Sequence, residues 1–146
     1  MRILELSFIP TLDNAQWATI AVRQIVETLM KTVKVAGIER MDKFLSEIEL
    51  ATGEACVNSV KHGPEQGIDK IQVSVVFKEK YSNFIVTVSD GNKRYDFSDR
   101  EPDFDVVPES GYGIYIMRNL MDKVSYQREK GRNLVIMEKE IKQGEQ

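Results

Sequence analysis

Residues 54–63 have the sequence Glu-Ala-Cys-Val-Asn-Ser-Val-Lys-His-Gly, and Pro64 follows them. Because glycine and proline end helices, these residues form the last turns of a helix that we predict from about residue 39 or 40 to residue 61. One stripe of this helix is apolar or small and repeats every three or four residues: Phe44, Ile48, Ala51, Ala55, Ser59 and His62. The small side chains in the middle of the stripe leave room beneath the helix for a ligand.

Two polar residues of the same segment, Glu54 and Asn58, lie four positions apart and share a second stripe beside the apolar one. We therefore expect both at the edge of the buried face, where a cleft between helix and sheet would open. A carboxylate there can accept a proton from an attacking hydroxyl, and an amide oxygen one turn later can bind Mg²⁺. The same spacing is common in amphipathic helices that carry no chemistry, and both residues would then be ordinary polar residues at the boundary.

Around this helix, the apolar patterns predict a second long helix, a short helix and several strands. The second long helix covers about residues 15–33, is capped by Asp13 or Asn14 and ends before Gly37. We place the strands at residues 3–8, 71–77, 84–88, 124–128 and 133–140, and the short helix at about 114–122. Strands joined by tight turns pair antiparallel, and the helices then collect on one face. The expected fold is an α/β (α+β) two-layer sandwich with a mixed, largely antiparallel sheet, formed by a single domain over residues 1–146.

Further candidate residues flank a long connection. Asp90 ends an apolar strand, where it either accepts a hydrogen bond from the exocyclic amine of adenine or belongs to an Asp-Gly turn. Residues 91–110 are longer than most connections and have little apolar periodicity, which is typical of a functional lid. The short helix is then preceded by two glycines, which can let the backbone approach a phosphate or can simply form a turn after the lid. The residues at this position are Ser110, Gly111, Tyr112 and Gly113.

The composition disfavours several classes of protein. The net charge of −3 argues against a nucleic-acid surface, and no apolar run approaches the length of a membrane span or signal peptide. The single cysteine, Cys56, suits a reducing compartment, so we expect a cytoplasmic protein. We interpret Cys56 as inert packing that points away from the apolar stripe, and His62 as structural. Four residues at helical spacing are expected in the core: Trp17, Met30, Met117 and Met121.

Five segments, in this order along the chain, resemble the motifs of the GHKL, or Bergerat-fold, ATPases: residues 54–63, 88–90, 95–97, 110–117 and 120–124. The first is especially similar to the helix motif Glu-Ala-x-x-Asn-x-x-x-His of the bacterial anti-sigma-factor serine kinases. The next two resemble the aspartate box of that family, and the last two resemble its second glycine box and the helix that follows. The resemblance covers about residues 3–141 and implies the Bergerat, or histidine-kinase-like ATPase, fold.

The resemblance also implies a role for each candidate residue. It makes Glu54 the general base, Asn58 the Mg²⁺ ligand and Asp90 the acceptor of the adenine amine. Residues 110–113 would hold the phosphates of ATP or ADP through backbone N–H groups. The cofactor-binding residues besides Asn58 and Asp90 would then be Asn92, Ser110, Gly111, Tyr112 and Gly113.

The first glycine box departs from the pattern of the family. The family has Asp-x-Gly-x-Gly, whereas this chain has Asn92 and Arg94 in place of the two later glycines. Asparagine tolerates positive φ better than most residues, so we expect Asn92 to keep the turn, which Arg94 cannot do. A threonine expected near residues 131–133 is also missing. These departures predict weaker ATP affinity or a different closure of the lid.

Members of the family phosphorylate a serine of a small STAS-domain anti-anti-sigma protein, sequester a sigma factor in their other state and usually form homodimers. The resemblance therefore implies a serine kinase and anti-sigma factor that switches between such partners, or another regulator. The altered glycine box leaves an alternative, which is a regulatory binding module that responds to nucleotide with weak or no turnover. A third interpretation, the catalytic domain of a histidine kinase, is disfavoured because we see no helix pair for dimerisation and phospho-acceptance.

Overall fold

The computed structural model describes residues 1–33, 38–63, 69–94, 97 and 112–142. Its elements follow the predicted order of one strand, two long helices, two strands, a short helix and two strands. Within these residues, no helix combines the length and the apolar character needed to cross a membrane.

The sheet has five strands in the spatial order β1-β2-β3-β5-β4. Each neighbouring pair is antiparallel, so the predicted largely antiparallel sheet is confirmed and the described strands include no parallel pair. β5 fits between β3 and β4 because the chain leaves the sheet after β3, forms a helix and returns along the outer edge. The strands are β1 Arg2–Phe8, β2 Ile71–Lys78, β3 Asn83–Asp90, β4 Lys123–Glu129 and β5 Arg132–Glu140.

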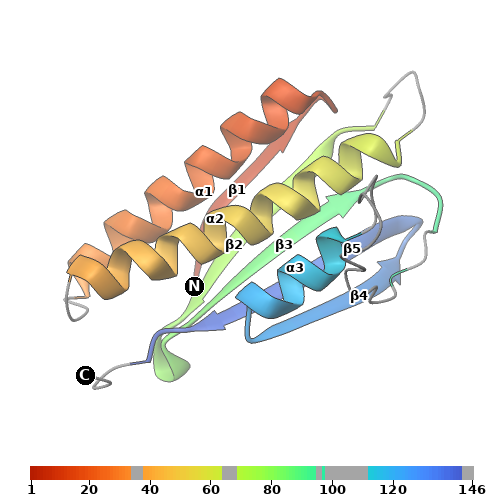
Figure 1. Cartoon of the computed structure of the whole chain (residues 1–146). Coiled ribbons are helices and arrows are strands. Elements are labelled where there is room, and N and C mark those ends of the chain that lie inside the picture. Colours follow the sequence, from red (N-terminus) through yellow and green to blue (C-terminus); the bar gives the residue numbers. More distant parts are fainter. Residues whose placement is uncertain (34–37, 64–68, 95–96, 98–111, 143–146) are drawn as a thin grey trace, which may run out of the picture.

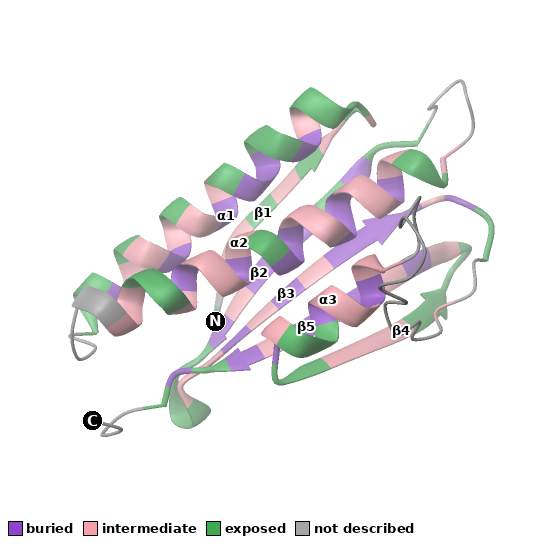
Figure 2. Cartoon of the chain, viewed as in Figure 1, coloured by how far each residue is buried: buried purple, intermediate pink, exposed green. Residues whose placement is uncertain are grey.

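The helices α1 (Leu12–Thr32), α2 (Ile38–Lys61) and α3 (Gly113–Leu120) cover one face of the sheet, which gives the predicted two layers (Figure 1). α2 lies between α1 and α3 and packs on both. Alternate residues of β2 face the helices and are buried, because side chains of a strand point to opposite faces in turn. Buried residues gather where the two layers meet (Figure 2).

The apolar stripe predicted for α2 is confirmed over most of its length. Ile48, Ala51, Ala55 and Ser59 are all buried, and Phe44 packs against the core from its edge. His62, at the end of the stripe, is exposed instead, because α2 ends at Lys61 and His62 lies beyond its last turn.

The core position predicted for Trp17 on α1 is wrong. Trp17 is 67% exposed, and Ile20 is also exposed. The buried face is formed instead by a stripe of mostly smaller residues, namely Ala15, Ala18, Thr19, Val22, Val26 and Met30. Small side chains on this face let α1 approach α2 and the sheet closely, whereas an indole would hold the layers apart.

Two further details of the helices differ from the sequence predictions. α1 is capped by Thr11, whose side chain accepts a hydrogen bond from the N–H of Asn14, rather than by Asp13 or Asn14. Cys56 does not point away from the core but is fully buried in it, and this burial raises the pKa of its thiol to about 12. The core positions expected for the three methionines are confirmed for Met30, Met117 and Met121.

A buried lysine fastens the C-terminal end of α3. Lys139 of β5 donates to the backbone oxygen of Leu120 at 2.6 Å and to the carboxylate of Glu47 on α2 at 2.5 Å. Its ammonium group also lies 5.5 Å from the centroid of the Phe44 ring. Because one side chain joins β5, α2 and α3, the position of α3 relative to α2 is fixed at this end.

Candidate functional site

The two polar residues of α2 meet the first residue of α3. A Cβ atom placed on Gly113 would lie 3.0 Å from Asn58 Nδ2 and 3.0 Å from Glu54 Oε2. Both side chains are half-buried, at the edge of the apolar stripe as predicted. Any side chain at position 113 would therefore occupy the space that Glu54 and Asn58 face, and glycine keeps it open.

Asp90 lies at the end of β3, beneath the last turns of α2. It is only 2% exposed, and its carboxylate accepts hydrogen bonds from three different parts of the chain. Ser59 of α2 donates to Oδ2 at 2.7 Å, while the N–H of Asn92 and the side chain of Asn133 donate to Oδ1 at 3.1 Å and 2.8 Å. Because Ser59 follows Asn58 directly, Asp90 is tied to the turn of α2 that carries Asn58.

Asn92 remains next to Asp90, but in a different way from the one predicted. Its φ is not positive: among described residues other than glycine, only Ser82 and Lys130 have positive φ. Its side chain instead donates to the backbone oxygen of Ser59 at 2.9 Å. The asparagine therefore holds the turn after β3 against α2 through its amide, without using the left-handed conformation that a glycine would allow.

Asn133 belongs to this cluster and was missed by the sequence analysis. It is 1% exposed and lies directly opposite Asp90 in the register of β3 and β5. The absence of the expected threonine near residues 131–133 was the available signal, since Asn133 brings a hydrogen-bonding side chain to that same place. Proximity to Asp90 depends on strand register, which the sequence does not state.

Asp69 is a second residue that the sequence analysis missed. A Cβ atom on Gly91 would collide with the carboxylate of Asp69, just before β2. This close approach explains why glycine follows Asp90, and it applies even though Gly91 does not have a positive φ.

Part of the predicted phosphate-binding segment lies outside the described residues. This holds for Ser110 and Gly111 and for most of the predicted lid at 91–110. Tyr112 precedes α3, and its backbone oxygen accepts from the N–H of Ile116 at 2.9 Å.

Phe97, within the predicted lid, is described and packs on the rest of the domain. Phe97 stacks on Tyr126 of β4, with 5.4 Å between ring centroids and 18° between ring planes. The guanidinium of Arg118 of α3 lies 5.3 Å from the centroid of the Phe97 ring. The Phe97 side chain is therefore held between β4 and α3.

The residues present fit a magnesium site of the predicted kind. The described residues contain no group of three or more His, Cys, Asp or Glu side chains that could enclose a metal. Mg²⁺ keeps most of its water and takes few protein ligands, all of them oxygen atoms. The amide oxygen of Asn58 next to a carboxylate and an open glycine position meets this requirement.

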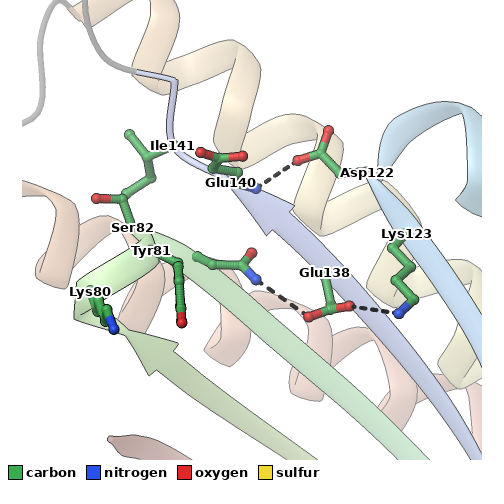
Figure 3. A pocket seen from close by; sticks show the side chains of 9 residues that line it. Lys80, Tyr81, Ser82, Asp122, Lys123, Glu138, Glu140 and Ile141 are labelled. Carbon is green, nitrogen blue, oxygen red and sulfur yellow. Dashed lines mark hydrogen bonds and ion pairs between the residues drawn. The ribbon is translucent and has the colours of Figure 1, made fainter.

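Two cavities of similar size also occur, one away from this site and one beside Glu54. One, of about 560 Å³, is at the opposite end of β3 from Asp90, where Glu138 is paired with Asn83 and Lys123 (Figure 3). The other, of about 550 Å³, is a groove between α1 and α2. The candidate base Glu54 lines this groove, together with apolar side chains that include Leu12, Ile20, Leu50 and Val57. The groove therefore gives Glu54 a second approach, from the side of α1.

Comparisons with known proteins agree with this geometry. The family described as "Histidine kinase-like ATPase domain" matches residues 14–139. The serine-protein kinase RsbW of Bacillus velezensis is 31% identical over 96 residues, which are 60% of this chain and 59% of the relative. RsbW of Bacillus subtilis is 29% identical over 96 residues, with the same coverage. The matches thus span about three fifths of the length of these relatives.

A solved structure shows the same fold at low sequence identity. The RsbU and RsbW domains of a Mycobacterium tuberculosis protein superpose with a TM-score of 0.62 and 13% identity. The match covers 95% of this chain and 33% of that one.

Proposed function

This chain belongs to the histidine kinase-like ATPase domain family, and from that premise we propose that it is an ATP- and Mg²⁺-dependent protein-serine kinase. The observation that carries the proposal is the meeting of Glu54 and Asn58 with Gly113, since it joins a candidate base and a candidate metal ligand at a glycine. The similarity to proteins named serine-protein kinase supports the choice of a serine as acceptor.

The nucleotide would lie between α2 and the sheet. Asp90 would accept a hydrogen bond from the exocyclic amine of adenine, because Ser59 is the only donor to its Oδ2 atom among the residues that the structure describes. The segment from Ser110 to Gly113 would hold the phosphates of ATP or ADP, where the N-terminal end of α3 favours an anion. The residue that would bind the base therefore ends β3 and is held by side chains of α2 and β5, and those that would bind the phosphates lie at the start of α3.

Phosphoryl transfer follows from this arrangement. The Glu54 carboxylate takes the proton of a serine hydroxyl, and the serine oxygen forms a bond to the γ-phosphorus. The bond between that phosphorus and the β–γ bridging oxygen breaks, and ADP leaves with the electron pair. Asn58 would hold Mg²⁺ through its amide oxygen, and the ion would offset the charge of the phosphates when bound.

The protein partners are proposed from the resemblance to anti-sigma-factor kinases. The acceptor would be a STAS-domain anti-anti-sigma protein, and the partner in the other state would be a sigma factor or another regulator. The homodimer expected for the family is proposed on the same basis. The groove between α1 and α2 offers space beside Glu54 for the segment that carries the acceptor serine.

A second candidate function has one observation in its favour. The first glycine box carries Asn92 and Arg94, and Asn92 is fixed to α2 by its side chain rather than held in a glycine-like turn. A turn fastened in this way would limit movement of the lid. The chain would then be a regulatory module that binds nucleotide with little or no turnover.

The Glu54→Ala substitution tests the kinase. We expect loss of phosphate transfer from radiolabelled ATP to a STAS-domain protein, while calorimetry shows ADP affinity within about threefold of wild type, since the base does not hold the nucleotide. Transfer at the wild-type rate would exclude Glu54 as the base. A wild-type protein that binds ADP but transfers no phosphate would support the regulatory module, and absence of binding would exclude both functions.

A further inference from the structure

Asn133 of β5 has no role in the proposed phosphoryl transfer, yet it makes more hydrogen bonds than any other side chain around Asp90. We propose that Asn133 is a positioning residue for base selection: it fixes the Asp90 carboxylate so that only Oδ2 remains free to accept from the exocyclic amine of a purine. This inference rests on the proposed nucleotide site and extends it to a residue outside the five segments that resemble family motifs.

The orientation of the Asn133 amide is determined by its surroundings. Its nitrogen faces three acceptors: Asp90 Oδ1 at 2.8 Å and the backbone oxygens of Asn92 and Lys93, each at 3.1 Å. Its oxygen faces two donors, the Tyr126 hydroxyl at 2.5 Å and the Arg128 guanidinium at 2.8 Å. A flipped amide would turn its oxygen toward a carboxylate and two carbonyls, so only one orientation is compatible with the contacts.

This orientation decides which oxygen of Asp90 is available. A carboxylate has about four acceptor positions, two on each oxygen. Oδ1 is filled by the N–H of Asn92 and by the amide of Asn133, whereas within the described part of the chain Oδ2 receives only the hydroxyl of Ser59. Among these contacts one acceptor position remains, and it is on Oδ2.

Fixing that position gives chemical selectivity. Adenine carries an amine at C6 that donates a hydrogen bond, while guanine and hypoxanthine carry a carbonyl oxygen there that would face the carboxylate. Without Asn133, Oδ1 would lose a donor and the carboxylate could rotate, so that a water molecule or another donor could satisfy it. Because Asp90 is 2% exposed, rotation is restrained mainly by these hydrogen bonds and by packing.

Asn133 is in turn held by β4. Tyr126 and Arg128 both belong to that strand, and Arg128 also donates to the backbone oxygen of Asn92 at 3.1 Å. The cluster thus joins the turn after β3 to the two strands at the far edge of the sheet. We expect substitutions of Tyr126 or Arg128 to weaken the selectivity for adenine, as substitutions of Asn133 do, but to a smaller extent.

The test measures the affinities of ADP and of inosine diphosphate by calorimetry with Mg²⁺ present. Inosine diphosphate replaces the C6 amine with a carbonyl and keeps the ribose and phosphates. The variants are Asn133→Leu and Asn133→Val, which both remove the amide donor. The matched control is Asn83→Leu, because Asn83 donates to Glu138 at 3.3 Å and lies at the opposite end of β3 from Asp90.

We expect the ratio of ADP to inosine diphosphate affinity to fall about tenfold, or about 1.4 kcal/mol, in both Asn133 variants and to stay unchanged in Asn83→Leu. A merely structural role would weaken both nucleotides alike and leave the ratio unchanged, which would overturn the inference. If neither Asn133 variant folds, Tyr126→Phe carries the test, with a fall of about threefold expected and an unchanged ratio counting against the inference. A wild-type protein that binds neither nucleotide would instead overturn the proposed function, and this inference with it.

Discussion

Gly113→Ala adds a single methyl group at the point where α2 and α3 meet. The new carbon would lie 3.0 Å from Glu54 Oε2 and from Asn58 Nδ2, and 3.4 Å from Asn58 Oδ1. Normal contact distances are about 3.5 Å or more, so the two nearest polar atoms must each retreat by roughly 0.5 Å. Displacements of about 1 Å in catalytic groups can reduce rates by about a hundredfold, so we expect a loss of about tenfold or more in phosphate transfer.

The same substitution should leave the fold intact. Gly113 does not have a positive φ, and alanine favours a helix over glycine by up to about 1 kcal/mol. The atoms in its way are ends of side chains rather than backbone. We therefore expect a free energy of unfolding equal to that of wild type or higher, together with lower activity.

Gly53→Ala is the matched control, since Gly53 is also in a helix. Its nearest contact would be the side chain of Thr19 at 3.8 Å, which is an ordinary distance. We expect a gain of about 0.5–1 kcal/mol in unfolding free energy and unchanged ADP affinity. Urea unfolding followed by circular dichroism and calorimetry with ADP measure these two quantities, and a transfer assay with radiolabelled ATP measures the activity of Gly113→Ala. A fully active Gly113→Ala protein with wild-type ADP affinity would refute the assignment of this corner as the phosphate-transfer site.

Two further predictions concern stability and reactivity. Lys139→Met should reduce the unfolding free energy by about 1–3 kcal/mol, because it leaves Glu47 and the Leu120 carbonyl without their buried donor. Lys43 pairs with Glu47 at the surface, so Lys43→Met should change the unfolding free energy by less than about 0.5 kcal/mol. Equal effects of the two substitutions in urea unfolding would contradict this prediction. Cys56 should react with a thiol reagent at pH 8 only through unfolding, since burial raises its pKa to about 12. The unfolded thiol ionises from about pH 9, so its contribution to stability should be complete below pH 9 and decline as the pH rises toward 12, and Cys56→Ala should remove this decline.

The sequence predicted the parts of the site that depend on helical spacing. Glu54 and Asn58 share a stripe because they are four residues apart, and that relation holds in any α-helix. The contact between Asp90 and Asn133 joins residues 43 positions apart, through the register of β3 with β5, so no local pattern reveals it. Asn92 illustrates a third case, because its conformational preference pointed to a turn whereas its side chain found a partner on α2.

The buried face of α1 could not be predicted for a related reason. The helix has apolar residues on more than one side, and periodicity alone does not say which side meets the sheet. The size of Trp17 favoured a buried position for its side of the helix. The side with the small residues Ala15 and Ala18 is buried instead, because it fits the narrow space beside α2. Packing density, which depends on the neighbouring elements, decided between the two.

The exposure of Trp17 also determines how the protein will behave spectroscopically. It is the only tryptophan of the chain, and its indole already faces water on the outer side of α1. Its fluorescence will therefore have the emission maximum of a hydrated indole in the native state and will shift little when the core melts. Conversely, any molecule that covers α1 will move the emission to shorter wavelength, so the native chain carries its own optical probe for contacts on that helix.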